Sequence, residues 1–358
     1  MHNVAKPTIT VLVDTYNHER FIEEALVSVM EQDFSPADME ILVVDDGSTD
    51  RTPEIVRKFE PRVRLIRKKN GGQASAFNAG IPEAQGEIVA FLDGDDWWSR
   101  NKLSRVVETM SADSQLGIVG HGIVIVHRDG SEQLETLRES LHFQANTLEG
   151  ARLFRVRGSL LGTSRMTIRA EVLRRIGPVP EALVVEADEY LFTLASVLAG
   201  AEILSETLTY YRLHEANGFQ LSAHDPLRIR RKQEVLAALC GALDPALRAH
   251  HVSTDAARAI LEVVQAEADQ LRLMLDGGRP WETLKTEHKI YEVLHPDAPF
   301  SHRVFKVITL LPTIVLPPKF YYRIRQRLSQ SDLYMRARKR WLPIPEMSHF
   351  HRERPSGS

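Results

Sequence analysis

The chain has 358 residues, 43% of them hydrophobic and 26% charged, so it can bury one large core or two modest ones and is predicted to be globular. The formal charge of −3 gives no reason to expect a nucleic-acid partner. One cysteine, Cys240, excludes an internal disulfide framework, favours a reducing compartment, and leaves no cysteine cluster for zinc.

Strand and helix signals alternate through the first part of the chain. The apolar, β-branched runs that predict strands are residues 8–14, 40–45, 63–67 and 87–92. The runs at helical spacing that follow them are residues 21–30, a segment that begins with Thr52 as N-cap and Pro53, residues 73–84, and residues 99–110. Such apolar strands separated by helices predict an α/β fold with a mostly parallel sheet covered on both faces.

The pattern is less regular after residue 115. Helices are predicted at residues 169–176, ended by Gly177, and at residues 188–199, ended by Gly200. Residues 226–280 are polar and amphipathic and predict further helices.

Polar side chains follow each predicted strand, and ligands bind at this edge of a parallel sheet. The clusters begin at Asp14, Asp45, Asn70 and Asp93. The last cluster places Asp93, Asp95 and Asp96 directly after an apolar strand, and such close carboxylates repel one another without a cation. Mg²⁺ and Mn²⁺ prefer carboxylate oxygens and share their shell with phosphates, although an acidic surface turn would look the same.

Several motifs together resemble glycosyltransferase family 2, a family of inverting enzymes with the GT-A fold. They are TYNHERFIEEALVSVMEQ, ILVVDDGSTD, NGGQASAFNAGIPEAQGEIVAFLDGDDWW, the acidic stretch Ala187-Asp188-Glu189, and YYRLH, between about residues 7 and 217. The resemblance implies transfer of a sugar from a nucleotide-diphosphate sugar, with a UDP-sugar favoured, to a hydroxyl of a glycan or a lipid-linked acceptor, as in polysaccharide biosynthesis at the cell envelope.

The resemblance also implies roles for particular residues. The nucleotide sugar is expected to contact Asp14, Thr15, Tyr16, Asp46, Asn78 and Asp93, with Tyr16 against the nucleobase and Asp46 accepting a hydrogen bond from it. Asp93 and Asp95 match the DxD motif that holds Mn²⁺ or Mg²⁺, and His214 matches a histidine that completes the metal shell. Asp188, in the first turn of a predicted helix, matches the general base.

Two positions depart from the family pattern. Ala187 stands where the family usually has the first acid of a Glu-Asp pair, so a supporting carboxylate would have to come from Glu186 or Glu189. Asp14 stands where the family more often has proline or a small residue, which puts the identity of the donor in doubt.

Two other functions would also use an α/β sheet or the acidic residues. A sugar nucleotidyltransferase would need a glycine-rich, basic loop after the first strand, and the turn DTYNHER has no glycine. A catalytically inactive sugar-nucleotide-binding or scaffold protein would not need Asp93, Asp95 and Asp188 together.

The expected organisation is a catalytic domain at residues 1–225, with a nucleotide-sugar half to about residue 115 and an acceptor half from 116, then a helical extension at 226–300 and a basic tail at 301–358. The tail has twelve Lys/Arg and three Asp/Glu, a local charge of +9, which leaves −12 for the rest. Its apolar run, residues 304–316, is shorter than the roughly 20 residues of a membrane span.

The tail has two interpretations. It either lies in an anionic membrane interface or packs on the catalytic domain as a C-terminal helix. The N-terminal residues carry no secretory signal pattern, so the expected location is cytoplasmic, with peripheral attachment to the inner face of the cytoplasmic membrane if the tail binds lipid.

Overall fold

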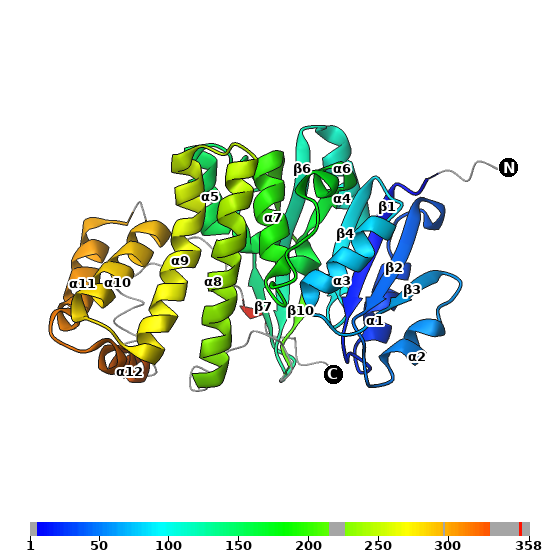
Figure 1. Cartoon of the computed structure of the whole chain (residues 1–358). Helices are drawn as coiled ribbons and strands as arrows, with labels where there is room; N and C mark the ends of the chain where they lie inside the picture. The colour runs from blue at the N-terminus through cyan, green and yellow to red at the C-terminus, as the bar shows by residue number, and fades with distance from the viewer. Residues whose placement is uncertain (1–5, 215–225, 296–297, 330–350, 353–358) are drawn as a thin grey trace.

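A computed structural model describes residues 6–214, 226–295, 298–329 and 351–352. The strands form one 11-stranded sheet, which lies in the right-hand part of Figure 1, with helices on both faces. The strands are β1 (Ile9–Thr15), β2 (Met39–Asp45), β3 (Val63–Arg67), β4 (Ile88–Asp93), β5 (Trp97–Trp98), β6 (Leu116–Val126), β7 (Glu132–Glu135), β8 (Leu141–Phe143), β9 (Thr167–Arg169), β10 (Gly200–Arg212) and β11 (His351–Arg352).

The helices surround this sheet and continue beyond it at the left of Figure 1. The α-helices are α1 (Ile22–Met30), α2 (Thr52–Arg57), α3 (Gln73–Gly80), α4 (Lys102–Ala112), α5 (Leu148–Arg157), α6 (Ala170–Ile176), α7 (Ala187–Leu198), α8 (Pro226–Ala249), α9 (Thr254–Asp276), α10 (Pro280–Leu294), α11 (Phe300–Leu310) and α12 (Pro318–Ser329). Short 3₁₀ turns are η1 (Pro36–Asp38), η2 (Ile81–Glu83), η3 (Gly158–Leu161), η4 (Thr163–Arg165) and η5 (Leu311–Ile314).

The predicted α/β fold is confirmed, and the four predicted strands are β1 to β4. They pair in parallel in the order β4, β1, β2, β3, because each crossover helix returns the chain to the same edge. One detail was wrong at the start of α2. Thr52 does not cap the helix with its own side chain; Asp50 Oδ1 accepts hydrogen bonds from the Thr52 N–H (2.9 Å) and hydroxyl (2.6 Å).

The irregular stretch after residue 115 contains the other half of the sheet. β6 and β10 pair in parallel, while β5, β8 and β9 add antiparallel pairs, so the sheet is mixed. β10 mixes polar and apolar residues without regular alternation, and its register against β6 shifts at three points, at Gly200/Ala201, Leu204/Thr207 and Thr207/Thr209. These irregularities explain why periodicity alone did not reveal the strand.

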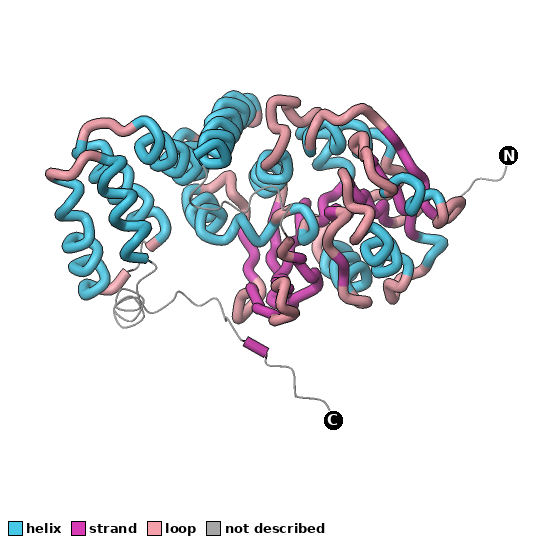
Figure 2. Tube along the Cα trace, turned by 90° about the horizontal axis from the view of Figure 1, so that it is seen from below, coloured by secondary structure: helices cyan, strands magenta, loops and turns pink. Residues whose placement is uncertain are grey.

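Both faces of the sheet are buried by helices. One hydrophobic core lies between the sheet and α1, α2 and α4, and a second lies between the sheet and α3, α5, α6 and α7. The second core continues into α8 and α9 through Leu236, Leu239 and Ile260, so the predicted C-terminal helical region packs directly on the α/β part. Figure 2 shows the strands gathered at one end and α10 to α12 at the other.

A buried ion-pair cluster holds the last helices against α10. The Glu287 side chain on α10 is 1% exposed and pairs with Lys306 of α11 at 3.2 Å and with Arg325 of α12, and Gln270 of α9 donates to it at 2.6 Å. Burial alone would raise the pKa of Glu287, but the charges of Arg325 and Lys306 and the Gln270 hydrogen bond hold that pKa below its usual value.

We expect Arg325→Met to reduce the free energy of unfolding. Removing one partner of a buried ion pair costs about 3–5 kcal/mol, and since Arg325 is 42% exposed and Lys306 remains, a loss of about 2 kcal/mol is expected. Arg323→Met, on the exposed side of the same helix, is the matched control and should change stability by less than about 0.5 kcal/mol. Equal effects of the two substitutions in denaturant titrations would contradict the role of Glu287.

The lowered pKa of Glu287 also gives this stabilisation a pH dependence. A carboxylate with a depressed folded-state pKa stabilises the fold above the usual pKa of glutamate, and the contribution is lost as the pH falls through the lowered value. The stability difference between Arg325→Met and the unsubstituted protein should therefore be full at neutral pH and shrink in acid.

Candidate active site

A cleft of about 710 Å³ opens at the C-terminal ends of β1, β2 and β4, where the parallel part of the sheet places its strand-end side chains. It brings together most of the residues predicted from the sequence. Those that line it are Asp14, Thr15, Tyr16, Asp46, Asp93, Asp95 and Asp188. Others that line it were not assigned a role from the sequence, and they include Asn70, Gln73, Asp96, Thr163, Ser164 and Arg165.

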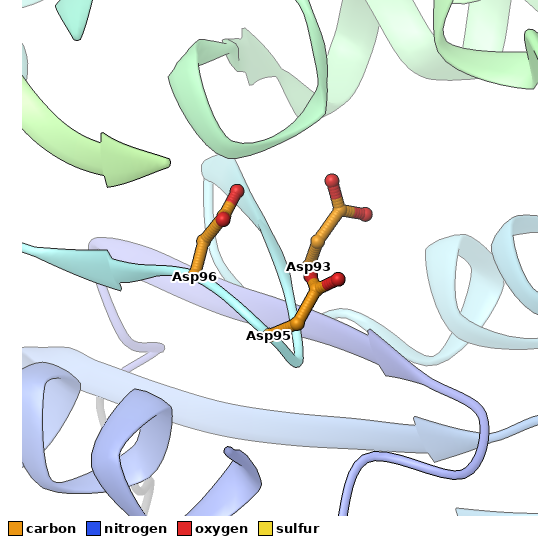
Figure 3. Close-up of side chains that lie close together, drawn as sticks. All are labelled: Asp93, Asp95 and Asp96. Carbon is orange, nitrogen blue, oxygen red and sulfur yellow. The ribbon is translucent and has the colours of Figure 1, made fainter. Parts of the chain in front are cut away.

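Three carboxylates meet on the turn that follows β4. Asp93, Asp95 and Asp96 each offer an oxygen within 4.8 Å of the others, and Figure 3 shows them on this turn. The turn packs so closely on β1 that a Cβ at Gly94 would lie 2.7 Å from the Thr15 Oγ1. Glycine at this position therefore lets the acidic turn approach the end of β1.

The electrostatics of this group favour a cation. Burial, together with the neighbouring carboxylates, raises the pKa values of Asp93 and Asp96 well above the usual range. Asp96 is 1% exposed and accepts hydrogen bonds from the Ser164 hydroxyl (2.6 Å) and the Arg212 N–H (3.0 Å). Crowded carboxylates whose charge is opposed by burial and mutual repulsion fit a hard divalent cation.

Asp95 differs from its two neighbours because histidines surround it. His214 Nε2 lies 2.8 Å and His18 Nε2 lies 3.7 Å from Asp95 Oδ2. Burial alone would raise the pKa of Asp95, but the His214 hydrogen bond and the nearby histidine charges lower it. Sequence reasoning placed His214 beside the DxD motif, and the structure puts it in contact with Asp95; His18 was missed, although it lies in the TYNHER motif.

The unusual residue Asp14 belongs to the same group. It is the last residue but one of β1 and pairs with Asp93 on β4, and among the described residues its buried Oδ1 has no hydrogen-bond partner. Burial and the charges of Asp95 and Asp188 raise the pKa of Asp14 to about 8. Asp14, where the family resemblance implies proline or a small residue, thus adds a fourth acid to the crowded end of the cleft, which fits a bound cation.

Tyr16 and Asp46, which the sequence assigned to the nucleotide, also line the cleft. Tyr16 is 43% exposed, so its ring is accessible to a planar ligand. Asp46 is 4% exposed and accepts hydrogen bonds from the Gly72 N–H (2.7 Å), the Gly71 N–H (3.1 Å) and the Lys68 ammonium (2.6 Å). Asp46 therefore holds the turn before α3 in place, a role that the sequence did not indicate.

Asn78 lies elsewhere. Its amide exchanges two hydrogen bonds with the backbone of Val179, at 2.7 and 2.8 Å, and it lines a separate cavity with Ile81 and Pro82. Asn78 was expected to line the donor site, but it does not line the cleft. Its amide instead joins α3 to the loop before α7. The asparagine that lines the cleft is Asn70, directly before Gly71 and Gly72.

Asp188 is the second residue of α7, and it lines the cleft. Its Oδ2 accepts hydrogen bonds from the Thr163 hydroxyl (2.9 Å) and the Thr163 N–H (3.1 Å). Gln73 links the same parts, donating to Thr163 at 3.0 Å and accepting from the Ala187 N–H at 3.0 Å. Glu186 also lines the cleft, in a left-handed conformation with φ of 60°, and burial raises its pKa to about 7.

The fold is shared with solved glycosyltransferase structures. Residues 1–349 of Staphylococcus aureus TarS in complex with UDP-GlcNAc align with a TM-score of 0.51 and 21% identity over 80% of this chain and 90% of that chain. The mannosyltransferase PcManGT from Pyrobaculum calidifontis, in complex with GDP-Man and Mn²⁺, aligns with a TM-score of 0.50 and 22% identity over 94% of this chain and 88% of that chain.

Curated relatives match the sequence itself. An uncharacterized glycosyltransferase of Nostoc sp. is 34% identical over 230 residues, which are 60% of this chain and 67% of the relative. Glycosyltransferase AglE of Haloferax volcanii is 30% identical over 186 residues, which are 51% of this chain and 59% of the relative. The match to EpsJ of Bacillus subtilis, 41% identical, spans 32% of this chain and 34% of that protein.

The family model named Glycosyl transferase family 2 matches residues 10–175, which include β1, β2, β4 and the acidic turn after β4. Since this model spans the strands that build the cleft, and the Nostoc relative is matched over 67% of its length, the chain belongs to glycosyltransferase family 2.

Proposed function

We propose that the protein is an inverting glycosyltransferase that moves a sugar from a UDP-sugar to a hydroxyl of a glycan or lipid-linked acceptor. The observation that carries the proposal is that the acidic group on the turn after β4 and Asp188 on α7 line the same cleft. TarS, whose fold this chain shares, is named as a poly(ribitol-phosphate) β-N-acetylglucosaminyltransferase, and its complex contains UDP-GlcNAc.

The donor end of the cleft fits a diphosphate held through a cation. Asp93 and Asp95, with Asp96 beside them, would hold Mn²⁺ or Mg²⁺, and the histidine contacts of Asp95 keep its carboxylate oriented. A divalent cation here would stabilise the negative charge that develops on the leaving diphosphate. PcManGT supports this part of the proposal because its complex contains Mn²⁺ together with GDP-Man.

Tyr16, Asp46 and the turn that Asp46 holds would bind the nucleoside of the donor. We propose that the accessible Tyr16 ring stacks on the nucleobase, since base and aromatic faces stack favourably. Asp46 would accept the base N–H in addition to its contacts with Gly71, Gly72 and Lys68, and it also fixes the backbone beneath the nucleotide.

Asp188 is proposed as the general base. As the acceptor oxygen forms its bond to the anomeric carbon, the bond from that carbon to the diphosphate breaks, and the hydroxyl proton passes to Asp188. The two Thr163 hydrogen bonds orient the carboxylate at the start of α7.

The two other functions are separable by experiment. A nucleotidyltransferase would form a nucleotide sugar from a nucleoside triphosphate and a sugar phosphate, with release of pyrophosphate. An inactive binding protein would bind a nucleotide sugar and leave it intact. No contact within the described residues of the cleft favours either of them over transfer.

Release of nucleoside diphosphate tests the proposal directly. The full chain is incubated with a panel of UDP-, GDP- and dTDP-sugars in Mn²⁺ or Mg²⁺, with water or added glycans as acceptors, and EDTA as the control. We expect metal-dependent release of the nucleoside diphosphate from at least one donor, with UDP-sugars the most active. Intact donors throughout the panel, despite measurable binding, would overturn the proposal in favour of an inactive binding protein.

A further inference from the structure

The outer face of α11 is apolar. Five large apolar side chains recur at helical spacing on this face and its continuation into η5, and all of them are exposed: Phe300 (82%), Val304 (38%), Val307 (59%), Ile308 (57%) and Leu311 (54%). Ile314 (58%) and Val315 (77%) extend the surface to the end of the turn. We call these seven residues the C-terminal apolar face.

The inner face of α11 is the more polar one. His302 and Leu310 are buried against the rest of the molecule, and Lys306 pairs with Glu287 of α10. A helix of a water-soluble domain normally buries its apolar stripe and exposes its charges. α11 instead exposes most of its large apolar side chains, and contiguous exposed apolar surface of this kind marks an interaction site.

The neighbouring helix α12 carries a basic stripe. Lys319, Arg323 and Arg327 recur every four residues and are exposed, and Phe320 (50%) and Leu328 (50%), one position further along, form an apolar stripe beside them. α12 contacts η5, so the basic stripe adjoins the end of the C-terminal apolar face. The helix is therefore amphipathic, with its cations next to exposed apolar groups.

The charge of this region has one sign. Residues 300–329 contain six Lys/Arg and no Asp or Glu. Two of the six, Lys306 and Arg325, are paired with Glu287, and the other four, Arg303, Lys319, Arg323 and Arg327, are exposed. A protein partner would have to match a surface that is both apolar and purely cationic, whereas an anionic membrane interface offers headgroup charge and an apolar layer together.

We propose that the C-terminal apolar face and the basic stripe of α12 dock the protein on a membrane surface that contains anionic lipid. The apolar side chains would enter the boundary between headgroups and acyl chains, while Lys319, Arg323 and Arg327 contact lipid phosphates. Among the described helices none is long and apolar enough to cross a membrane, so the segment would lie along the surface.

This surface is separate from the cleft. In Figure 1, α8 and α9 lie between the sheet and the group of α10 to α12. Substitutions on the outer face should therefore leave cleavage of a soluble donor unchanged. Point substitutions are needed because removing α11 and α12 would leave Glu287 buried without its two cations.

Sedimentation with lipid vesicles tests the proposal on the full chain. We expect the protein to sediment with vesicles of phosphatidylcholine and phosphatidylglycerol, to sediment much less with phosphatidylcholine alone, and to be released by salt. Val307→Glu with Ile308→Glu, and separately Lys319→Glu with Arg323→Glu, should each weaken binding about tenfold or more.

Two substitutions elsewhere serve as controls. Lys58→Glu, directly after α2 at the opposite end of the molecule, repeats the charge reversal, and Leu148→Glu on α5 repeats the change of an exposed apolar residue. Both should bind vesicles as the unsubstituted protein does. Thermal melting without lipid should show that all four variants are folded.

Other occupants of the surface give different results. A second copy of the chain would appear as a dimer in analytical ultracentrifugation without lipid, would be dissociated by Val307→Glu with Ile308→Glu, and would leave the protein in the supernatant with every vesicle. That result, or equal sedimentation of the face variants and the controls, would overturn the proposal. Binding to neutral and anionic vesicles alike would overturn the role assigned to the basic stripe.

Discussion

Asp188→Asn is expected to lower turnover by about two to four orders of magnitude while donor affinity changes by less than about twofold. The amide cannot accept the acceptor's proton at neutral pH, which removes the base. The substitution keeps the shape of the side chain and an oxygen that can accept from Thr163, so α7 should stay in place. Single-turnover rates and calorimetric donor binding would separate the two effects.

Thr163→Val is the matched control for orientation. It removes the hydroxyl that donates to Asp188 at 2.9 Å but keeps the carboxylate and the backbone N–H. We expect it to lower turnover by only about tenfold, since positioning and not the base itself is affected. If Asp188→Asn instead stays within a few-fold of the unsubstituted enzyme, Glu186 becomes the candidate base, because it lines the same cleft and its pKa is raised to about 7.

The α/β fold could be predicted because its strands and helices show their patterns within short stretches of sequence. The runs that became β1, β2 and β4 are apolar and β-branched, and the helices between them show clear periodicity, so a parallel sheet and the polar ends of its strands followed. β6 and β10 escaped notice for the opposite reason. Their pairing joins segments far apart in the chain, and β10 mixes polar and apolar residues without regular alternation and with shifts in register.

In the site too, features within short motifs could be predicted, and contacts between distant segments could not. Asp93, Asp95 and Asp188 could be chosen as candidates because each lies in a short motif with a fixed place relative to a strand or helix, and all three line the cleft. Contacts between distant segments were not recognisable, such as Ser164 donating to Asp96 and Thr163 donating to Asp188. The spacing of these partners in the sequence does not predict their contact. The turn η4, which carries Thr163 and Ser164, is placed beside the cleft by the antiparallel pairing of β9 with β4.

For Asn78 and the tail, the secondary structure could be predicted from the sequence but the tertiary contacts of the side chains could not. α3 is a helix as predicted, but the amide of Asn78 bonds to Val179, 101 residues away, and not to the cleft. In the tail, Lys306 and Arg325 count as basic residues in the sequence, yet both pair with Glu287 on α10. Which of the basic residues remain exposed on the surface could therefore be determined only from the packing of the helices.

Asp95→Ala is expected to abolish the dependence of donor binding on a divalent cation. The diphosphate of the donor carries negative charge that the crowded carboxylates would repel without a cation between them. In the unsubstituted protein, EDTA should weaken binding of the nucleotide sugar on the order of 100-fold relative to Mn²⁺. In Asp95→Ala the affinity should be low in both conditions, as measured by calorimetric titration.

A second readout does not depend on the donor. Mn²⁺ that binds the folded protein should raise its melting temperature, and Asp95→Ala should remove most of that rise. Asp129→Ala, which removes an exposed carboxylate from a surface turn, is the matched control and should keep both the rise in melting temperature and the sensitivity to EDTA. Equal donor affinity in EDTA and Mn²⁺ would refute the metal assignment. A Mn²⁺ effect that survives Asp95→Ala would contradict the role of Asp95 as a metal ligand.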